Sequence, residues 1–196
     1  MRVLVIENGR VNLNKLSKQI LRNETRLIKK YPPSVEGGYI TDGNTGLGLD
    51  SLTSRFYHYN VLNWWGTKTL RKEIRRGYER YTGVRDTVLY IQCWANVMRK
   101  GEQIRTHSHC ENQVQPQHAL SGHLCVQVDG STSTYYHNKP LVNKNGQLVF
   151  FPMYLPHSTD RYMGDGERIT IAFDINSEEF FKFDVIEQSQ KHYVSI

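Results

Sequence analysis

The sequence contains no long run of apolar residues. No stretch reaches the roughly 18 to 20 consecutive apolar residues that a membrane-spanning helix needs. The first residues, MRVLVIENGRVNLNK, also lack the apolar segment and small-residue cleavage site of a secretory signal. We therefore expect a protein that does not contact a membrane and that resides in the cytoplasm.

Cysteine is scarce, and internal repeats and low-complexity tracts are absent. The three cysteines, Cys93, Cys110 and Cys125, form no C-x-x-C pair. An odd number of scattered cysteines fits reduced thiols better than a disulfide framework. At 196 residues the chain is long enough for one domain with a substantial core.

Positive charge exceeds negative charge by six. This balance mildly favours anionic partners such as phosphates, carboxylates or nucleic acid, without separating them. Much of the excess lies in KTLRKEIRRGYER (residues 68–80), where apolar residues recur at helical spacing and basic residues cover the rest. Such a helix serves either as a solvated face or as a contact surface, so nucleic acid is an open but weakly indicated partner.

The residue pattern changes near residue 84, from helical spacing to short strand-like segments. Before it, residues 11–30 predict a helix that ends at Tyr31-Pro32-Pro33, and the glycine-rich residues 34–50 predict a surface loop. After it come short β-branched and aromatic segments separated by Gly, Pro, Asn and Asp. We expect an α+β fold: a helical N-terminal region (1–83) packed on an antiparallel β-sandwich or barrel (84–196), together one structural domain.

The segment IRTHSHCENQ, residues 104–113, places two histidines and a glutamate at alternating positions. On a strand, residues two apart share a face, so His107, His109 and Glu111 would project to one side. Imidazole suits iron, zinc, copper and nickel, and a site with open positions on one face suits non-haem Fe(II). The segment predicts part of a metal site.

A third ligand and an anion-binding residue occur further along the chain. His157 follows a hydrophobic segment, and Pro156 restrains the backbone just before it. Arg168 comes eleven residues later and alternates with apolar residues, so Arg168 and Thr170 share a face. An inward arginine in a half-buried strand indicates an anionic partner, and guanidinium pairs bidentately with a carboxylate.

These residues resemble the motifs of the Fe(II)- and 2-oxoglutarate-dependent oxygenases. That superfamily carries H-x-D/E, then a distal histidine, then Arg or Lys; here the chain reads HSH, then His157, fifty residues after His107, then RIT. The sequence looks most like a small subfamily with W-x-N, LSG, FP-x-x-L-x-H and RI-x-I-x-F. Its matches lie within residues 90–175. The resemblance implies a double-stranded β-helix, or jelly-roll, core with N-terminal helices packed on one sheet.

A second resemblance fixes the register. AlkB-type nucleic-acid demethylases carry N-x-Y-x-x-G, five residues and H-x-D, where this chain reads NVMRKG, EQIRT and HSH. By resemblance, His107, His109 and His157 would bind Fe(II), 2-oxoglutarate would chelate the metal, and Arg168 with Thr170 would hold its distal carboxylate. Asn96 would touch 2-oxoglutarate, whereas Met98 replaces the family's tyrosine. O2 would be the oxidant, with succinate and CO2 as products of a dioxygenase, most simply a hydroxylase.

A histidine stands where the superfamily usually has a carboxylate, and alternatives follow from this. Glu111 could pair with His109 and His157, leaving His107 outside the ligand set. One alternative is a three-histidine, cupin-like metalloenzyme that does not use 2-oxoglutarate. Another is a non-catalytic β-sandwich with a binding or structural role. The substrate is not readable from the sequence, and a homodimer formed through N-terminal helices is an open expectation.

Overall fold

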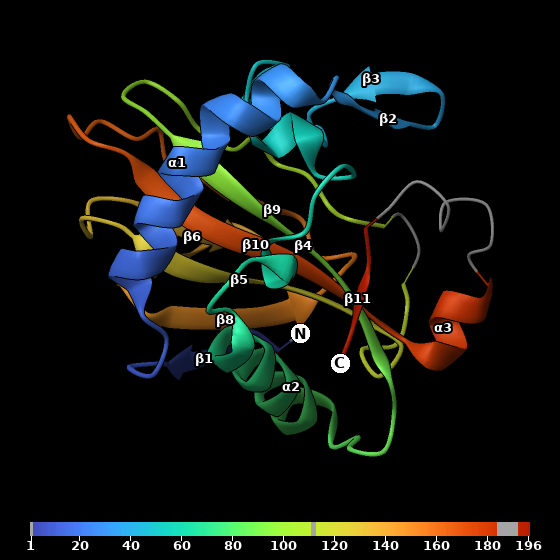
Figure 1. The fold of residues 1–196 in the computed structure, drawn as a ribbon. Coiled ribbons are helices and arrows are strands. Elements are labelled where there is room, and N and C mark those ends of the chain that lie inside the picture. Colours follow the sequence, from blue (N-terminus) through green and yellow to red (C-terminus); the bar gives the residue numbers. More distant parts are fainter. Residues whose placement is uncertain (1, 111–112, 184–191) are drawn as a thin grey trace.

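The main sheet of this computed structural model has six antiparallel strands, and the structure describes residues 2–110, 113–183 and 192–196 (Figure 1). Its strands are β1 (Leu4–Glu7), β4 (Leu89–Met98), β5 (Ala119–Gln127), β8 (Gln147–Pro152), β10 (Arg168–Ser177) and β11 (Val194–Ser195). They lie in the order β1-β8-β5-β10-β4-β11. The long strand β10 is therefore central, with β4 and β5 beside it.

A smaller antiparallel sheet faces the main one. Its order is β7-β6-β9, from β6 (Ser133–Tyr136), β7 (Lys139–Val142) and β9 (His157–Thr159). Two facing antiparallel sheets with few helices form the jelly roll, so the predicted fold class is confirmed.

Alternation along β10 sends its two sets of side chains in opposite directions. Ile169, Ile171, Phe173 and Ile175 are fully buried in the large apolar core that also contains the helices' buried faces. The intervening residues face the smaller sheet, because successive strand residues point to opposite faces. Those positions are Arg168, Thr170, Ala172 and Asp174.

Two helices cover the apolar face of the main sheet (Figure 1): α1 (Leu13–Lys30) and α2 (Lys68–Thr82). The side chain of Asn12 caps α1, and Gly83 ends α2 in the left-handed conformation. Both predicted helices are confirmed. A Cβ at Gly77 would lie 2.0 Å from the Phe150 ring, so α2 approaches β8 this closely only with glycine there. No helix in the described ranges has the length and apolar character to cross a membrane.

The N-terminal region contains more strand than the sequence patterns predict. β1 adds to the edge of the main sheet beside β8, although residues 1–83 were expected to be helical. The predicted surface loop contains a hairpin, β2 (Ser34–Glu36) and β3 (Tyr39–Thr41). Both strands are short, and short strands are hard to detect by periodicity. Three further short helices are η1 (Thr53–Arg55), η2 (Val61–Asn63) and α3 (Glu178–Phe183).

Candidate metal centre and its two pockets

Three histidine side chains meet between β9 and β10. His107 and His157 exchange backbone hydrogen bonds of 3.1 and 3.0 Å, and the His109 amide donates to the carbonyl of Met153 at 2.9 Å. One ring nitrogen from each histidine lies within 4.8 Å of the others, and the two Nε2 atoms of His107 and His109 are 3.3 Å apart. Distant parts of the chain thus form one compact donor set.

The expectation of a regular strand over residues 104–113 is wrong for its described part. His107 forms only an isolated bridge with His157, and residues 104–110 belong to no strand. The backbone instead takes its hydrogen bonds from β9 and from the turn after β8, and these bonds still bring both imidazoles to one place. Glu111, the alternative ligand, lies outside the described residues.

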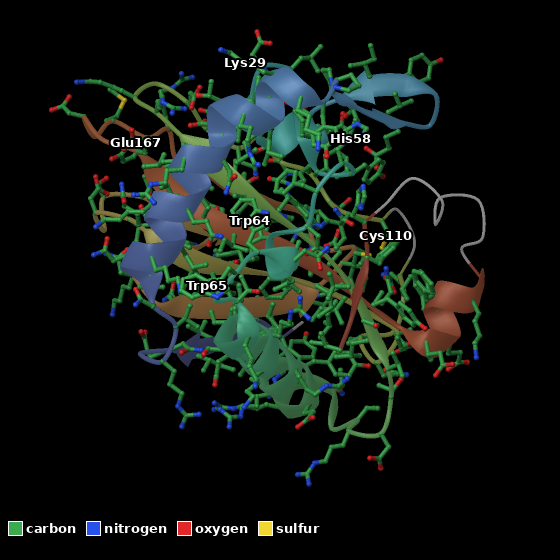
Figure 2. All side chains as sticks on the ribbon, in the orientation of Figure 1. Lys29, His58, Trp64, Trp65, Cys110 and Glu167 are labelled. Atoms are coloured by element: carbon green, nitrogen blue, oxygen red, sulfur yellow. The ribbon has the colours of Figure 1, made fainter. Side chains whose placement is uncertain are left out.

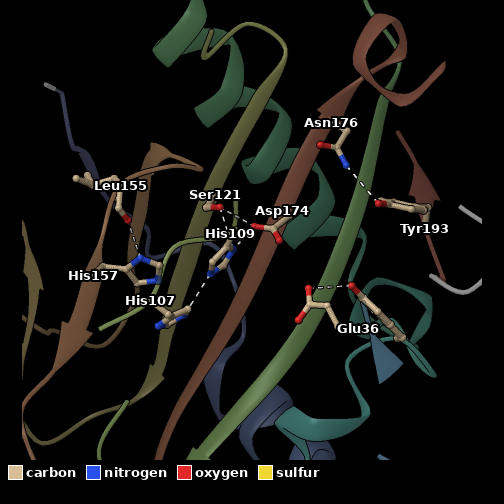
Figure 3. A network of polar contacts seen from close by, with 10 residues as sticks. Glu36, His107, His109, Ser121, Leu155, His157, Asp174, Asn176 and Tyr193 are labelled. Atoms are coloured by element: carbon tan, nitrogen blue, oxygen red, sulfur yellow. Dashed lines mark hydrogen bonds and ion pairs between the residues drawn. The ribbon is translucent and has the colours of Figure 1, made fainter. Parts of the chain in front are cut away.

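Each of the three rings has its Nδ1 atom occupied by a hydrogen-bond acceptor, and Figure 3 shows these bonds for His109 and His157. Nδ1 of His107 bonds the carbonyl of Arg105 at 2.9 Å, and Nδ1 of His157 bonds that of Leu155 at 3.0 Å. Nδ1 of His109 lies 2.5 Å from Oδ1 of Asp174. Such bonds place the ring hydrogen on Nδ1 and leave the Nε2 lone pairs available to a metal.

The electrostatic environment favours neutral rings at two of these positions. Burial lowers the pKa of His107 to about 4, with a further decrease from nearby His109, and burial lowers the pKa of His157 well below its usual value. Burial also acts to lower the pKa of His109, but Asp174 outweighs it and raises that pKa. Neutral imidazole is the form that binds metal, so this donor set fits a divalent transition metal.

Asp174 is a residue of this centre that the sequence patterns did not single out. Its Oδ1 accepts a hydrogen bond of 2.6 Å from Ser121 Oγ, which also lies 3.1 Å from Nδ1 of His109. Ser121 and Asp174 are register partners on β5 and β10. The alternation that joins Arg168 to Thr170 extends two steps further to Asp174, and following it would have found this residue.

A buried pocket leads from the histidines to Arg168. The guanidinium is 1% exposed; its Nε donates to Thr132 Oγ1 at 3.0 Å and its Nη1 lies 3.2 Å from the sulfur of Met98. Burial lowers the pKa of Arg168, and no carboxylate of the described residues forms an ion pair with it. The six predicted site residues all line this pocket: Asn96, His107, His109, His157, Arg168 and Thr170.

A further histidine lies on the wall of the same pocket. His123 is 9% exposed, its Nδ1 is 3.4 Å from the Tyr136 hydroxyl, and its Nε2 is buried without a hydrogen-bond partner. Burial, and secondarily Arg168, lowers its pKa to about 3. A buried polar atom without a partner is costly, and this one lines the same pocket as a guanidinium that has no carboxylate partner among the described residues. The pocket thus offers unused hydrogen-bonding capacity to an anion.

A second, larger hollow reaches the histidines from the solvent side. This cleft has a volume of about 1120 Å³ and shares Thr45, Trp94, His107 and His109 with the buried pocket. Its walls come from the β2–β3 hairpin, from β4 and β10, and from residues near α3. Cys110, labelled in Figure 2, also lines the cleft and marks its side of the molecule.

Comparison with known proteins connects this geometry to a family. Residues 130–174 match the family model described as "Putative 2OG-Fe(II) oxygenase". The matched segment includes His157, Arg168, Thr170 and Asp174. No curated protein matches the chain in sequence.

Solved structures share the fold at low sequence identity. AviO1 from Streptomyces viridochromogenes Tue57 is 11% identical, with 90% of each chain covered and a TM-score of 0.58. A prolyl-4-hydroxylase from Pseudomonas putida is 11% identical, with 89% of this chain and 92% of that chain covered and a TM-score of 0.53. The epimerase SnoN, in complex with Fe3+, alpha ketoglutarate and nogalamycin RO, is 10% identical over 89% of this chain and 78% of that chain (TM-score 0.53).

A jelly roll with three convergent imidazoles and a buried, unpaired arginine defines a non-haem metalloenzyme class. The family-model match over residues 130–174 supports assignment to the superfamily of 2-oxoglutarate- and Fe(II)-dependent oxygenases. The matched family model and the three-histidine donor set support an enzyme that uses Fe(II), 2-oxoglutarate and O2.

Proposed function

We propose that this oxygenase is a hydroxylase in which His107, His109 and His157 hold Fe(II). The support is the convergence of the three rings, each with its Nδ1 hydrogen-bonded and with one nitrogen of each ring within 4.8 Å of the others. Together with 2-oxoglutarate and O2, bound Fe(II) supplies the oxidising chemistry that releases succinate and CO2. The protein would bind these reactants and a substrate and orient them relative to one another.

One observation carries the use of 2-oxoglutarate: the buried guanidinium of Arg168 has no anionic partner among the described residues, and its pocket ends at the three histidines. An uncompensated buried charge is strongly unfavourable, so a carboxylate that enters the pocket gains a large share of its binding free energy there. Arg168, assisted by Thr170, would bind the distal carboxylate. A cupin-like enzyme without 2-oxoglutarate has no use for this arginine.

Two further side chains of the pocket would orient the same ligand. Asn96 is 6% exposed, and its Oδ1 accepts a hydrogen bond of 2.8 Å from Thr53, which leaves its amide hydrogens for a ligand oxygen. His123 can donate from Nε2 when the Tyr136 hydroxyl donates to Nδ1. A carboxylate in this pocket would satisfy polar groups that the protein alone leaves unpaired.

Asp174 would provide the negative charge that a carboxylate ligand supplies in most of the superfamily. Three neutral imidazoles would leave the +2 charge of a divalent ion uncompensated. The carboxylate of Asp174 lies behind one of these imidazoles, because it is hydrogen-bonded to Nδ1 of His109. A carboxylate behind a ligating histidine fixes its tautomer and makes it a stronger donor. Asp174 is thus a positioning residue, and Ser121 holds its carboxylate in place.

The proposal is tested by the stoichiometry of turnover. Purified enzyme with Fe(II), 2-oxoglutarate and 18O2 is assayed against a substrate panel for succinate and for product mass. A hydroxylase forms one succinate per product, and the product gains one 18O atom. A product of unchanged mass would indicate epimerisation and a loss of two hydrogens would indicate desaturation; either result would exclude hydroxylation while keeping the oxygenase chemistry.

A further inference from the structure

The open cleft differs in charge from the molecule as a whole. Its lining includes three carboxylates, those of Glu36, Asp42 and Asp174, and no lysine or arginine among the residues that the structure describes. The chain nevertheless carries 25 basic residues against 19 acidic ones. A cleft lined by one sign of charge concentrates ligands of the opposite sign, so this one disfavours anions.

The three carboxylates line the same cleft as His107 and His109. Glu36 Oε1 accepts a hydrogen bond of 3.2 Å from the Tyr57 hydroxyl, and Figure 3 shows Glu36 on the same side of β4 and β10 as Asp174. Asp42 Oδ2 accepts from the amide of Gly48 at 2.9 Å, which fixes its carboxylate at the cleft wall. Both carboxylates are held by the protein, but neither forms an ion pair with a lysine or arginine of the described ranges.

Aromatic rings line the same walls. Phe56 packs against Tyr57 and Trp94, with ring centroids 4.1 and 5.9 Å apart, and all three line the cleft. At the rim, Tyr39 is 79% exposed and Ile40 is 61% exposed, although both are apolar enough to favour burial. Aromatic faces next to carboxylates bind organic cations, because each ring presents its negative quadrupole to the charge.

The size of the cleft indicates a ligand larger than a free amino acid. Pockets for small molecules commonly measure about 300–1,000 Å³, and this cleft lies above that range at about 1120 Å³. The exposed hairpin residues Tyr39 and Ile40 extend the apolar surface beyond the centre. A side chain attached to a peptide would reach the histidines while its backbone occupied the rim.

We propose that the cleft binds an organic cation, an amine or guanidinium on an aliphatic chain as in a lysine or arginine side chain of a peptide, and that Glu36 and Asp42 recognise its charge. This inference rests on the proposed function, since it names the substrate class of the same centre. It makes the basic helix α2 irrelevant to substrate charge, because none of its residues lines the cleft.

Calorimetry under anaerobic conditions on the enzyme with Fe(II) and 2-oxoglutarate tests this directly. The probes are acetyl-Gly-Lys-Gly amide, its norleucine and glutamate counterparts, and pentylamine. We expect the lysine peptide to bind about tenfold tighter than the norleucine peptide, the glutamate peptide to bind weakest, and added salt to narrow the difference. Equal or tighter binding of the norleucine or glutamate peptide would overturn the proposal. Pentylamine binding as tightly as the lysine peptide would keep the cation and reject the peptide.

Charge-neutral variants localise the effect. In Glu36→Gln, which keeps the acceptor for Tyr57, the lysine preference should fall several-fold, and Asp42→Asn should lower it as well. Asp86→Asn is the matched control, since Asp86 is exposed on the loop between α2 and β4 and does not line the cleft. An unchanged preference in both cleft variants would contradict the assignment.

The 2-oxoglutarate-dependent visible band of the Fe(II) enzyme is recorded in the same samples. Its absence in wild type would count against the proposed function, whereas calorimetry on the metal-free protein would still test the charge selectivity of the cleft.

Discussion

The buried pocket around Arg168 and the open cleft beneath the β2–β3 hairpin meet at His107 and His109, and their charges are opposite in sign. The pocket contains one guanidinium without a carboxylate partner in the described chain; the cleft contains carboxylates without a lysine or arginine. Each side can bind an ion of the other sign. On the proposed function, an anionic co-substrate and a cationic substrate would therefore approach a metal at the histidines from different directions.

The largest effect should follow from removing a metal ligand, because both hollows depend on the ion between them. His107→Ala, His109→Ala and His157→Ala should each lower Fe(II) affinity by at least about 100-fold, measured by anaerobic titration. His192→Ala is the control, since His192 is exposed and does not line the buried pocket. Glu111→Ala tests the alternative ligand set, and we expect it to change Fe(II) affinity little. If Glu111→Ala instead lowered Fe(II) affinity as much as His109→Ala does, while His107→Ala left it unchanged, the third ligand would be Glu111.

The next effect concerns the positive side of the comparison. Arg168→Ala removes the partner of a buried carboxylate, which costs about 2–5 kcal/mol, so the Kd for 2-oxoglutarate should rise by roughly 100-fold or more. Arg168→Lys should retain part of the affinity because the charge remains while bidentate pairing is lost. Arg22→Ala, at an exposed position of α1, serves as the control. Circular dichroism verifies that each variant is folded, and unchanged 2-oxoglutarate affinity in folded Arg168→Ala would refute the role.

A smaller effect is expected at Asp174, which touches the centre through His109. Asp174→Asn keeps the shape of the side chain but removes its charge, and Fe(II) affinity should fall about 10- to 100-fold, as is usual for groups behind a ligand. Ser121→Ala leaves the carboxylate in place and should have the lesser effect. A role limited to packing would leave the energy of the iron–2-oxoglutarate absorption band unchanged in Asp174→Asn, whereas loss of the charge should shift it.

The smallest effect is on stability and concerns the neutral histidines at the two hollows. Burial lowers the pKa of His107 to about 4 and that of His123 to about 3, whereas an unfolded histidine titrates near 6.5. Below pH 6.5 these two histidines therefore bind more protons in the unfolded chain than in the folded one, and their contribution lowers stability as pH decreases. Urea unfolding of the metal-free protein should show a loss of about 1–2 kcal/mol per histidine between pH 7.5 and pH 5. His123→Gln should flatten this dependence; an identical slope in that variant would show that His123 does not contribute.

The apolar spacing of the long helices and the order of the motifs made the fold class and most candidate site residues predictable from the sequence. Both helices follow from apolar spacing, and the jelly roll, the three histidines and Arg168 follow from motif order along residues 96–170. The two missed features have physical reasons. The β2–β3 hairpin consists of three-residue strands whose exposed apolar side chains show no inward face. Alternation along the strand places Asp174 on the same face as Arg168 and Thr170, but its contact with His109, far away in the sequence, is visible only in the folded chain.

Anaerobic addition of Fe(II) and then 2-oxoglutarate to the purified protein tests the central claim most directly. A visible charge-transfer band that requires both additions, and that needs far more 2-oxoglutarate in Arg168→Ala than in wild type, is the predicted result. A metal-replete wild-type protein that develops no band at saturating 2-oxoglutarate, or an Arg168→Ala variant that titrates like wild type, would contradict the account.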